Sequence, residues 1–168
     1  MNSETITNIA NLALTLSFIV ALIFGIAQVK TAKRDRRERL TLEVLRQFQT
    51  IEFVEIITYI SSSDMPSTWA DLQNLPAKER IMLVQFGQQM ESLGMMVAEG
   101  IIKMDLVDKT LGSFVTSAWN KCEAMFLDIR QQQPDPFLAE YYQWLAEAID
   151  ERMKKKPRKP FHLTHKPA

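Results

Sequence analysis

The stretch Thr5–Val29, TITNIANLALTLSFIVALIFGIAQV, carries no charged residue, although Glu4 and Lys30 stand directly on either side of it. A helix of this length reaches about 37 Å, which is enough to cross a hydrocarbon core of about 30 Å. We therefore predict a transmembrane helix over residues 5–29. A cleaved signal peptide is the alternative, but such peptides begin with basic residues, and here Lys and Arg occur only after the apolar run.

A basic juxtamembrane segment, residues 30–39, follows this run. Its six basic residues are Lys30, Lys33, Arg34, Arg36, Arg37 and Arg39. Because positively charged flanks stay on the cytoplasmic side, the segment predicts an N-terminus outside and the remaining chain in the cytoplasm. These side chains are also candidates for contact with the membrane surface, as are Lys154, Lys155 and Lys156 near the other end of the chain.

Small residues recur at every fourth position of the predicted transmembrane helix: Ala13, Ser17, Ala21 and Gly25. Small residues at this spacing let another helix approach closely, so they are candidates for pairing with a protein partner or with a second copy. Such residues are also common in membrane helices that do not pair.

Charge is unevenly distributed along the 168 residues, although the net charge is zero. Residues 40–151 hold 7 basic and 17 acidic groups, whereas residues 152–168 hold 7 basic groups and no acidic one. We predict that residues 154–168 form a basic, flexible tail. The tail could keep the protein soluble, bind anionic lipid or bind nucleic acid. Nucleic-acid binding is the weakest of these hypotheses, because Phe161 is the one aromatic residue of the tail that could stack on a base.

Apolar periodicity predicts helices throughout residues 40–153, and no stretch alternates with the period of a strand. The first helix should continue past Lys30 to Ile60, with one apolar side made of Leu40, Val44, Leu45, Phe48 and Ile51. Residues 51–60 are apolar on all sides, which favours a buried helix and leaves a short strand as the alternative. Ser61–Pro66 should break it. Ser67 or Thr68 should cap a short helix that ends at Leu75, and Pro76 should open the next helix.

Three longer helices should complete a small all-α bundle over residues 40–153. The helix that ends near Gly100 should bury Leu83, Phe86, Met90, Leu93, Val97 and Ile101. The helix from Asp105 should bury Leu111, Phe114, Ala118, Cys122, Met125 and Ile129. After a loop at residues 131–136, the helix over residues 136–153 should bury Leu138, Tyr141, Leu145, Ala148 and Ile149.

One pattern within the bundle resembles the DUF4760 family. It consists of Phe86, Leu93-Gly94, Glu99-Gly100-Ile101-Ile102, Leu106, Trp119, Arg130, Pro134, Tyr141 and Leu145. The resemblance implies a small bacterial protein with one N-terminal membrane helix, a basic segment and a helical domain, and hence a place in the inner membrane. It implies no activity. Trp119 and Arg130 lie three helical turns apart, so we expect both to face one neighbour, as packing residues or as a site pair.

The sequence contains no recognisable catalytic constellation, and we predict no cofactor and no metal site. Both histidines, His162 and His165, fall in the tail, and the single cysteine, Cys122, is expected to be a buried apolar residue. We therefore expect a membrane-anchored module for protein–protein interaction, in which Met82, Met90, Met95, Met96 and Met104 could line an adaptable groove. The alternative is a metal-dependent enzyme or regulator that uses Glu91 and Glu99.

Overall fold

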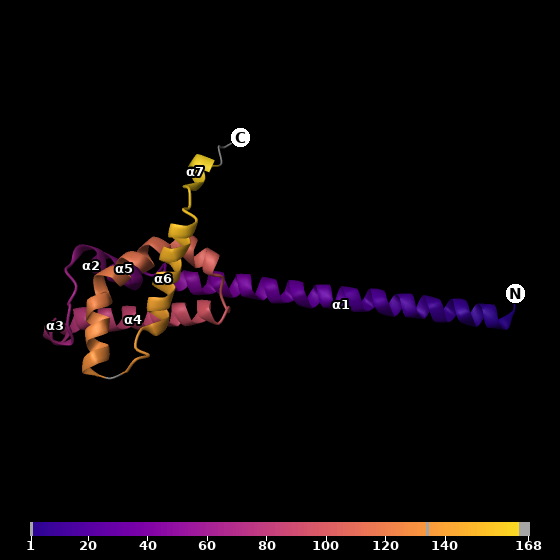
Figure 1. Cartoon of the computed structure of the whole chain (residues 1–168), viewed down its shortest axis with the longest axis horizontal. Coiled ribbons are helices and arrows are strands. Elements are labelled where there is room, and N and C mark those ends of the chain that lie inside the picture. The colour runs from indigo at the N-terminus through magenta and orange to yellow at the C-terminus, as the bar shows by residue number, and fades with distance from the viewer. Residues whose placement is uncertain (1, 134, 165–168) are drawn as a thin grey trace. The chain divides into compact units, whose positions relative to one another are not determined.

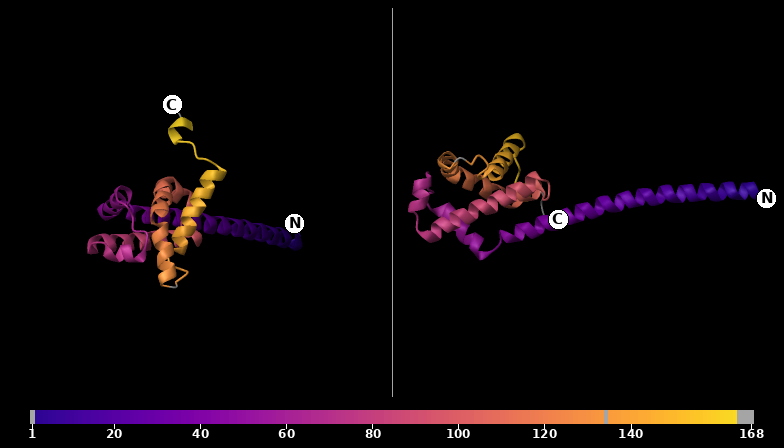
Figure 2. Two further views of the ribbon diagram at one scale, coloured as in Figure 1. Left: turned by 60° about the vertical axis from the view of Figure 1, so that its left-hand side comes forward. Right: turned by 90° about the horizontal axis from the view of Figure 1, so that it is seen from below.

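The computed structural model describes residues 2–133 and 135–164, and within them every regular element is a helix (Figure 1, Figure 2). This confirms the predicted all-α class. The chain divides into two compact units, of which the first ends at Leu40 and the second begins at Thr41. The helices are α1 (Ser3–Gln47), α2 (Ile51–Ser62), α3 (Trp69–Asn74), α4 (Ala77–Ala98), α5 (Met104–Gln132), α6 (Glu140–Lys155) and α7 (Phe161–Thr164).

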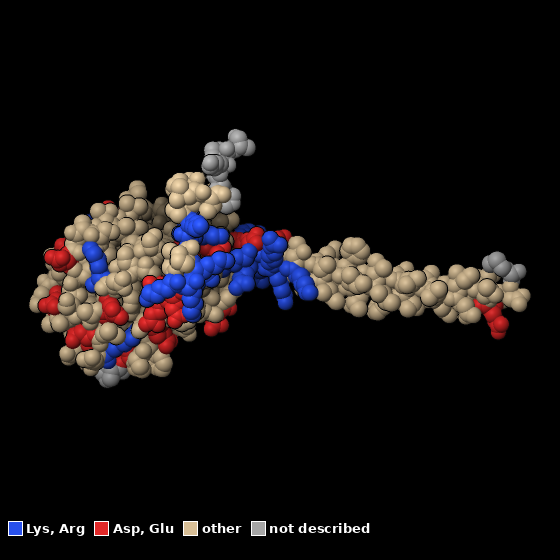
Figure 3. Space-filling model, turned by 45° about the horizontal axis from the view of Figure 1, so that its top comes forward, with Lys and Arg blue, Asp and Glu red and all other residues tan. Residues whose placement is uncertain are grey.

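The first unit consists of the N-terminal part of α1, and it has no interior. Every side chain from Asn2 to Arg37 is exposed. Figure 3 shows a long stretch of this helix without charged side chains, followed by a group of basic ones. In the sequence this stretch is residues 5–29. By length and composition, α1 can cross a membrane.

The predicted continuous helix from Lys30 to Ile60 is wrong, because the chain breaks after Gln47. Thr50 is the N-cap of α2, and its hydroxyl oxygen accepts a hydrogen bond from the Phe53 amide at 3.3 Å. The break turns the apolar face, so that Phe53 is buried whereas Ile51 is 77% exposed. Threonine is favoured at N-caps, but Thr41 and Thr58 lie inside α1 and α2, so Thr50 alone did not mark the break.

Two other helix boundaries confirm the sequence prediction. Thr68 caps α3 in a capping box with Asp71, and each residue's side chain accepts a hydrogen bond from the other's backbone amide. Gly100 follows the last residues of α4 with φ 66°, and the Ile101 amide donates to the Met96 carbonyl at 2.9 Å. Because the chain leaves the helical path at Gly100, the residues after it no longer follow the helical periodicity of α4. Consequently Ile102 is fully buried and Ile101, predicted to be buried, is 42% exposed.

The last long helix differs from its prediction in both position and register. α6 begins at Glu140 rather than at residue 136, and it buries Tyr142 completely, whereas Tyr141 is only partly buried. It also extends to Lys155, so the predicted flexible tail begins inside a helix, and α7 lies further along that tail. Pro134 of the family pattern and residues 165–168 of the tail, including His165, lie outside the described residues.

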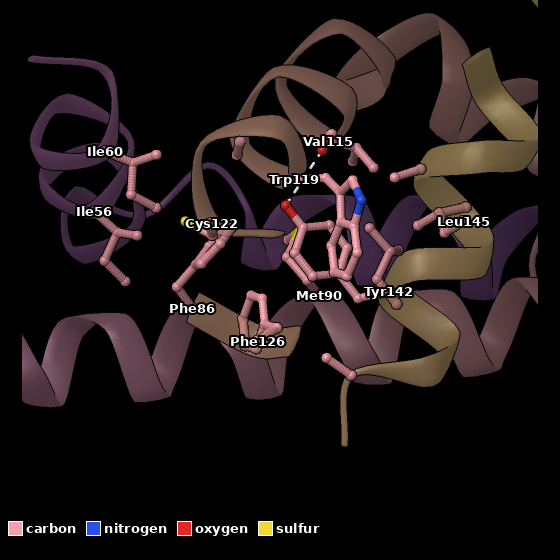
Figure 4. Close-up of a cluster of buried hydrophobic side chains, with 14 of the residues drawn as sticks. Ile56, Ile60, Phe86, Met90, Val115, Trp119, Cys122, Phe126, Tyr142 and Leu145 are labelled. Atoms are coloured by element: carbon pink, nitrogen blue, oxygen red, sulfur yellow. Dashed lines mark hydrogen bonds between the residues drawn. The ribbon is translucent and has the colours of Figure 1, made fainter. Parts of the chain in front are cut away.

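The core of the second unit is built around an unbroken series of aromatic contacts. Neighbouring rings in it lie 4.9–6.0 Å apart, and the series contains Phe48, Phe53, Phe114, Phe86, Tyr142, Trp119 and Phe126. Tyr142 points from α6 into its centre, where its hydroxyl donates to the Val115 carbonyl at 3.2 Å (Figure 4). The residues of α4 predicted to be in the core are all buried, from Leu83 to Val97.

Candidate functional site

Glu91 of α4 fixes the beginning of α6. The N-cap residue of α6 is Ala139, whose side chain cannot accept a hydrogen bond from the helix amides. Its backbone has the left-handed conformation, with φ 56°. Instead, the two carboxylate oxygens of Glu91 accept hydrogen bonds from the amides of Tyr141 and Tyr142, at 3.2 and 2.9 Å. A carboxylate from another helix therefore supplies the cap and also meets the positive end of the helix dipole.

Gly94, one turn further along α4, allows the two helices to cross in contact (Figure 1). A Cβ atom at this position would overlap the Tyr141 carbonyl oxygen and lie 2.5 Å from the carbonyl carbon. Gly94 thus permits the short distance between α4 and α6, and Glu91 fixes which residues of α6 lie at the crossing.

Trp119 and Arg130, the predicted pair, both contact the last part of the bundle. The Trp119 ring stacks on Phe126 and meets Tyr142 edge-on. The Arg130 guanidinium donates to the Leu138 carbonyl and to the Gln143 side chain, each at 2.7 Å, and so ties α5 to the start of α6. Their contacts are those of a packing tryptophan and a bridging arginine.

A largely apolar cavity of about 290 Å³ lies between α3, α4, α5 and the segment that leads into α6. The Trp69 amide in α3 donates to the Asp128 carboxylate of α5 at 2.7 Å, which holds α3 in place as one wall. The residues that line the cavity are Trp69, Leu72, Leu83, Val84, Gly87, Gln88, Glu91, Met125, Phe126, Ile129, Gln133, Leu138 and Ala139. Sequence reasoning missed this cavity, because its walls come from four separate segments.

The structure does not bring Glu91 and Glu99 together. Glu91 is engaged by the amides of α6, whereas Glu99 is an exposed residue at the end of α4, about 12 Å further along the helix axis. Among residues 2–133 and 135–164, no group of three or more His, Cys, Asp or Glu side chains could hold a metal ion. The structure thus does not juxtapose the two carboxylates on which the enzyme alternative was based.

The methionines and the cysteine belong mainly to the core. Met90 is fully buried, Met82, Met96 and Met104 are partly buried against the core, and Met95 is 36% exposed, so the five do not line one groove. Cys122 is also fully buried, as predicted, and burial raises the pKa of its thiol to about 12. At neutral pH this thiol is protonated and unreactive.

The basic residues near the end of α6 are largely paired with acidic ones. Arg152 contacts the carboxylates of Asp105 and Asp108, at 3.4 and 3.7 Å, and Lys154 and Lys155 pair with acidic residues one turn earlier in α6. The hydrogen bond from Lys109 lowers the pKa of Asp105. Figure 3 shows basic and acidic side chains interleaved on this face of the bundle.

The four small residues of α1, Ala13, Ser17, Ala21 and Gly25, are all exposed. Apart from Gly25, its two neighbours in the chain and the adjacent backbone of α1, no heavy atom lies within 4 Å of the position that a Cβ of Gly25 would occupy. The basic residues Lys30, Lys33, Arg34, Arg36 and Arg37 are exposed as well, and so is Arg39. Arg34 forms an ion pair with Glu38 at 3.1 Å.

These features define a class of protein: a small helical bundle that follows an N-terminal helix long and apolar enough to cross a membrane. Residues 15–149 match the family described as a domain of unknown function, DUF4760, and the chain belongs to that family. The match confirms the resemblance noted from the sequence and extends well beyond the pattern that carried it. No curated protein and no solved structure matches the chain.

Proposed function

We propose that the protein is a single-pass membrane protein of the bacterial inner membrane that works by binding another protein or a second copy of itself. The observation that carries this proposal is the exposure of 13 large apolar side chains on α1, from Ile6 to Val29, each of them between 46% and 70% exposed. A soluble protein rarely leaves so much contiguous apolar surface uncovered, and a bilayer would cover all of it.

The proposed orientation places the N-terminus outside and the bundle in the cytoplasm. It is supported by the six basic residues at 30–39, which would meet the anionic inner leaflet directly after the apolar run. In spheroplasts, a membrane-impermeant maleimide should label Ser3→Cys from outside and leave Ser62→Cys unlabelled until the cells are lysed. Both positions are exposed, and Cys122 gives little background because it is buried. The reverse labelling pattern would reject this orientation.

The proposed pairing surface of α1 is the face that carries Ser17, and a matched pair of variants tests it. At about 100° per residue, Ser17 and Thr15 lie on nearly opposite sides of the helix. Ser17→Leu fills the groove between small residues, so we expect the recovered partner or second copy to fall about tenfold, equivalent to about 1.4 kcal/mol. Thr15→Leu makes the same kind of change on the other side and should leave recovery unchanged.

The measurement is the stoichiometry of the complex that returns with the tagged full chain after mild-detergent extraction from its native membranes. A discrete homo-oligomer or a second protein at fixed stoichiometry, sensitive to Ser17→Leu and insensitive to Thr15→Leu, would support the proposal. A chain that returns alone and monomeric, or equal effects of the two variants, would refute pairing through this face.

A further inference from the structure

Two residues that line the cavity, Gly87 and Ala139, have backbone properties that are unfavourable for the stability of the fold. Gly87 stands in the interior of α4, where a glycine weakens a helix relative to alanine. A Cβ there would meet only the Phe126 ring, at 3.4 Å, so crowding does not require the glycine. Ala139 holds a left-handed conformation, which is unfavourable for a residue with a side chain. Such departures from local preference are expected at functional sites.

The size and lining of the cavity indicate what would fill it. An apolar cavity of about 150 Å³ holds one benzene molecule, so on this scale a cavity of about 290 Å³ holds roughly twelve carbon atoms. Leu72, Leu83, Met125 and Ile129 are apolar walls that offer no hydrogen bond. An aliphatic chain satisfies these walls, whereas a polar molecule would lose its hydration without compensation.

The polar residues of the lining indicate the head group. They are Gln88, Glu91 and Gln133, and only Glu91 among them is ionisable. Each Glu91 oxygen accepts one amide hydrogen bond, which leaves lone pairs for a hydroxyl donor. Arg130 lies nearby but does not line the cavity, and its Nη2 atom is buried within the protein. An anionic head group would therefore meet a carboxylate and no cation.

From these contacts we infer that the cavity binds the aliphatic chain of a hydroxyl-bearing amphiphile without a negative charge, such as a long-chain alcohol or a monoglyceride. This inference goes beyond the proposed function, because it assigns the bundle a lipid-like ligand that is independent of any partner bound through α1. The chain lies among the walls from α3, α4 and α5, and the hydroxyl group donates to Glu91.

Photolabelling of the full chain in nanodiscs of zwitterionic phospholipid tests the inference. The probes are a ten-carbon alcohol with a diazirine on its chain and the carboxylate of the same length. Label on the α1 peptide reports the concentration of each probe in the bilayer. Relative to α1, we expect the alcohol to label the cavity-lining parts of α4 and α5 about fivefold more than the carboxylate, which Glu91 repels.

Gly87→Leu places a side chain in the cavity and should reduce the labelling of α4 and α5 to background, while labelling of α1 remains. Ser92→Leu adds the same side chain at an exposed position of α4 outside the cavity, and the alcohol should label this variant as strongly as it labels the natural chain. Intrinsic fluorescence melts establish that each variant is folded. If Gly87→Leu does not fold, the comparison of the alcohol with the carboxylate on the natural chain decides the matter.

Three outcomes would overturn the inference: no bundle labelling by the alcohol, labelling by the carboxylate as strong as that by the alcohol, or a folded Gly87→Leu variant that is labelled as strongly as the natural chain. Absence of label on α1 would instead count against the proposed membrane anchor. The two proposals therefore fail in distinguishable ways.

Discussion

Replacing Gly94 with alanine should destabilise the bundle by about 3 kcal/mol or more, at or above the upper end of what overpacking usually costs. The new methyl group would overlap the backbone carbonyl of Tyr141, and a backbone cannot move aside as a flexible side chain can. α4 and α6 would have to separate, and the hydrogen bonds between Glu91 and the amides of α6 would lengthen with them.

Intrinsic fluorescence is a suitable measurement, because all three tryptophans, Trp69, Trp119 and Trp144, lie in the bundle and none lies in the first unit. Denaturation of the full chain in detergent would then report the bundle alone. Gly87→Ala is the matched control, since its methyl group makes only an ordinary contact with Phe126 and improves helix propensity by up to about 1 kcal/mol. Equal stability of the two variants would contradict the close crossing at Gly94.

Replacing Tyr142 with alanine should cost about 3–5 kcal/mol, the range for removing a large aromatic side chain from a core. The ring is completely buried, and it makes edge contacts with Phe86, Trp119 and Phe126. Its loss would leave a cavity at the point where α4, α5 and α6 meet (Figure 4).

Two controls separate the contributions to this effect. Tyr142→Phe keeps the ring and loses only the hydrogen bond to the Val115 carbonyl, so it should cost about 1 kcal/mol. Tyr141→Ala removes a side chain that is only partly buried, and the cost should be well below that of Tyr142→Ala. The same fluorescence-monitored denaturation measures all three. A larger loss for Tyr141→Ala than for Tyr142→Ala would restore the register predicted from the sequence and reject the structural one.

Local signals carried much of the fold prediction. Thr68 with Asp71, and Gly100 after an apolar helix, mark helix ends through interactions among neighbouring residues, so they could be recognised without knowing the tertiary structure. The buried stripe from Leu83 to Val97 was predictable for the same reason, because the 3.6-residue period is a local property.

The failures share a different cause. Tyr141 and Tyr142 lie four and three residues before the buried Leu145, so helical periodicity alone does not tell which of them is buried. The start of α6 is fixed instead by Glu91, fifty residues earlier in the chain, which binds both of their amides. The break at Thr50 depends on the burial of Phe53 against Phe48 and Phe114. The cavity has even less local signature, since only an unexplained glycine at position 87 marks it in the sequence.

The cap that Glu91 provides also has a consequence for the order in which the chain is made. The carboxylate is synthesised about fifty residues before the amides that it binds. While the ribosome is still synthesising α5, α6 is not yet present to pack against α4, and the backbone of α4 at Gly94 remains uncovered. The nascent bundle becomes a closed unit only when α6 emerges, so the last long helix to be translated is the one that completes the fold.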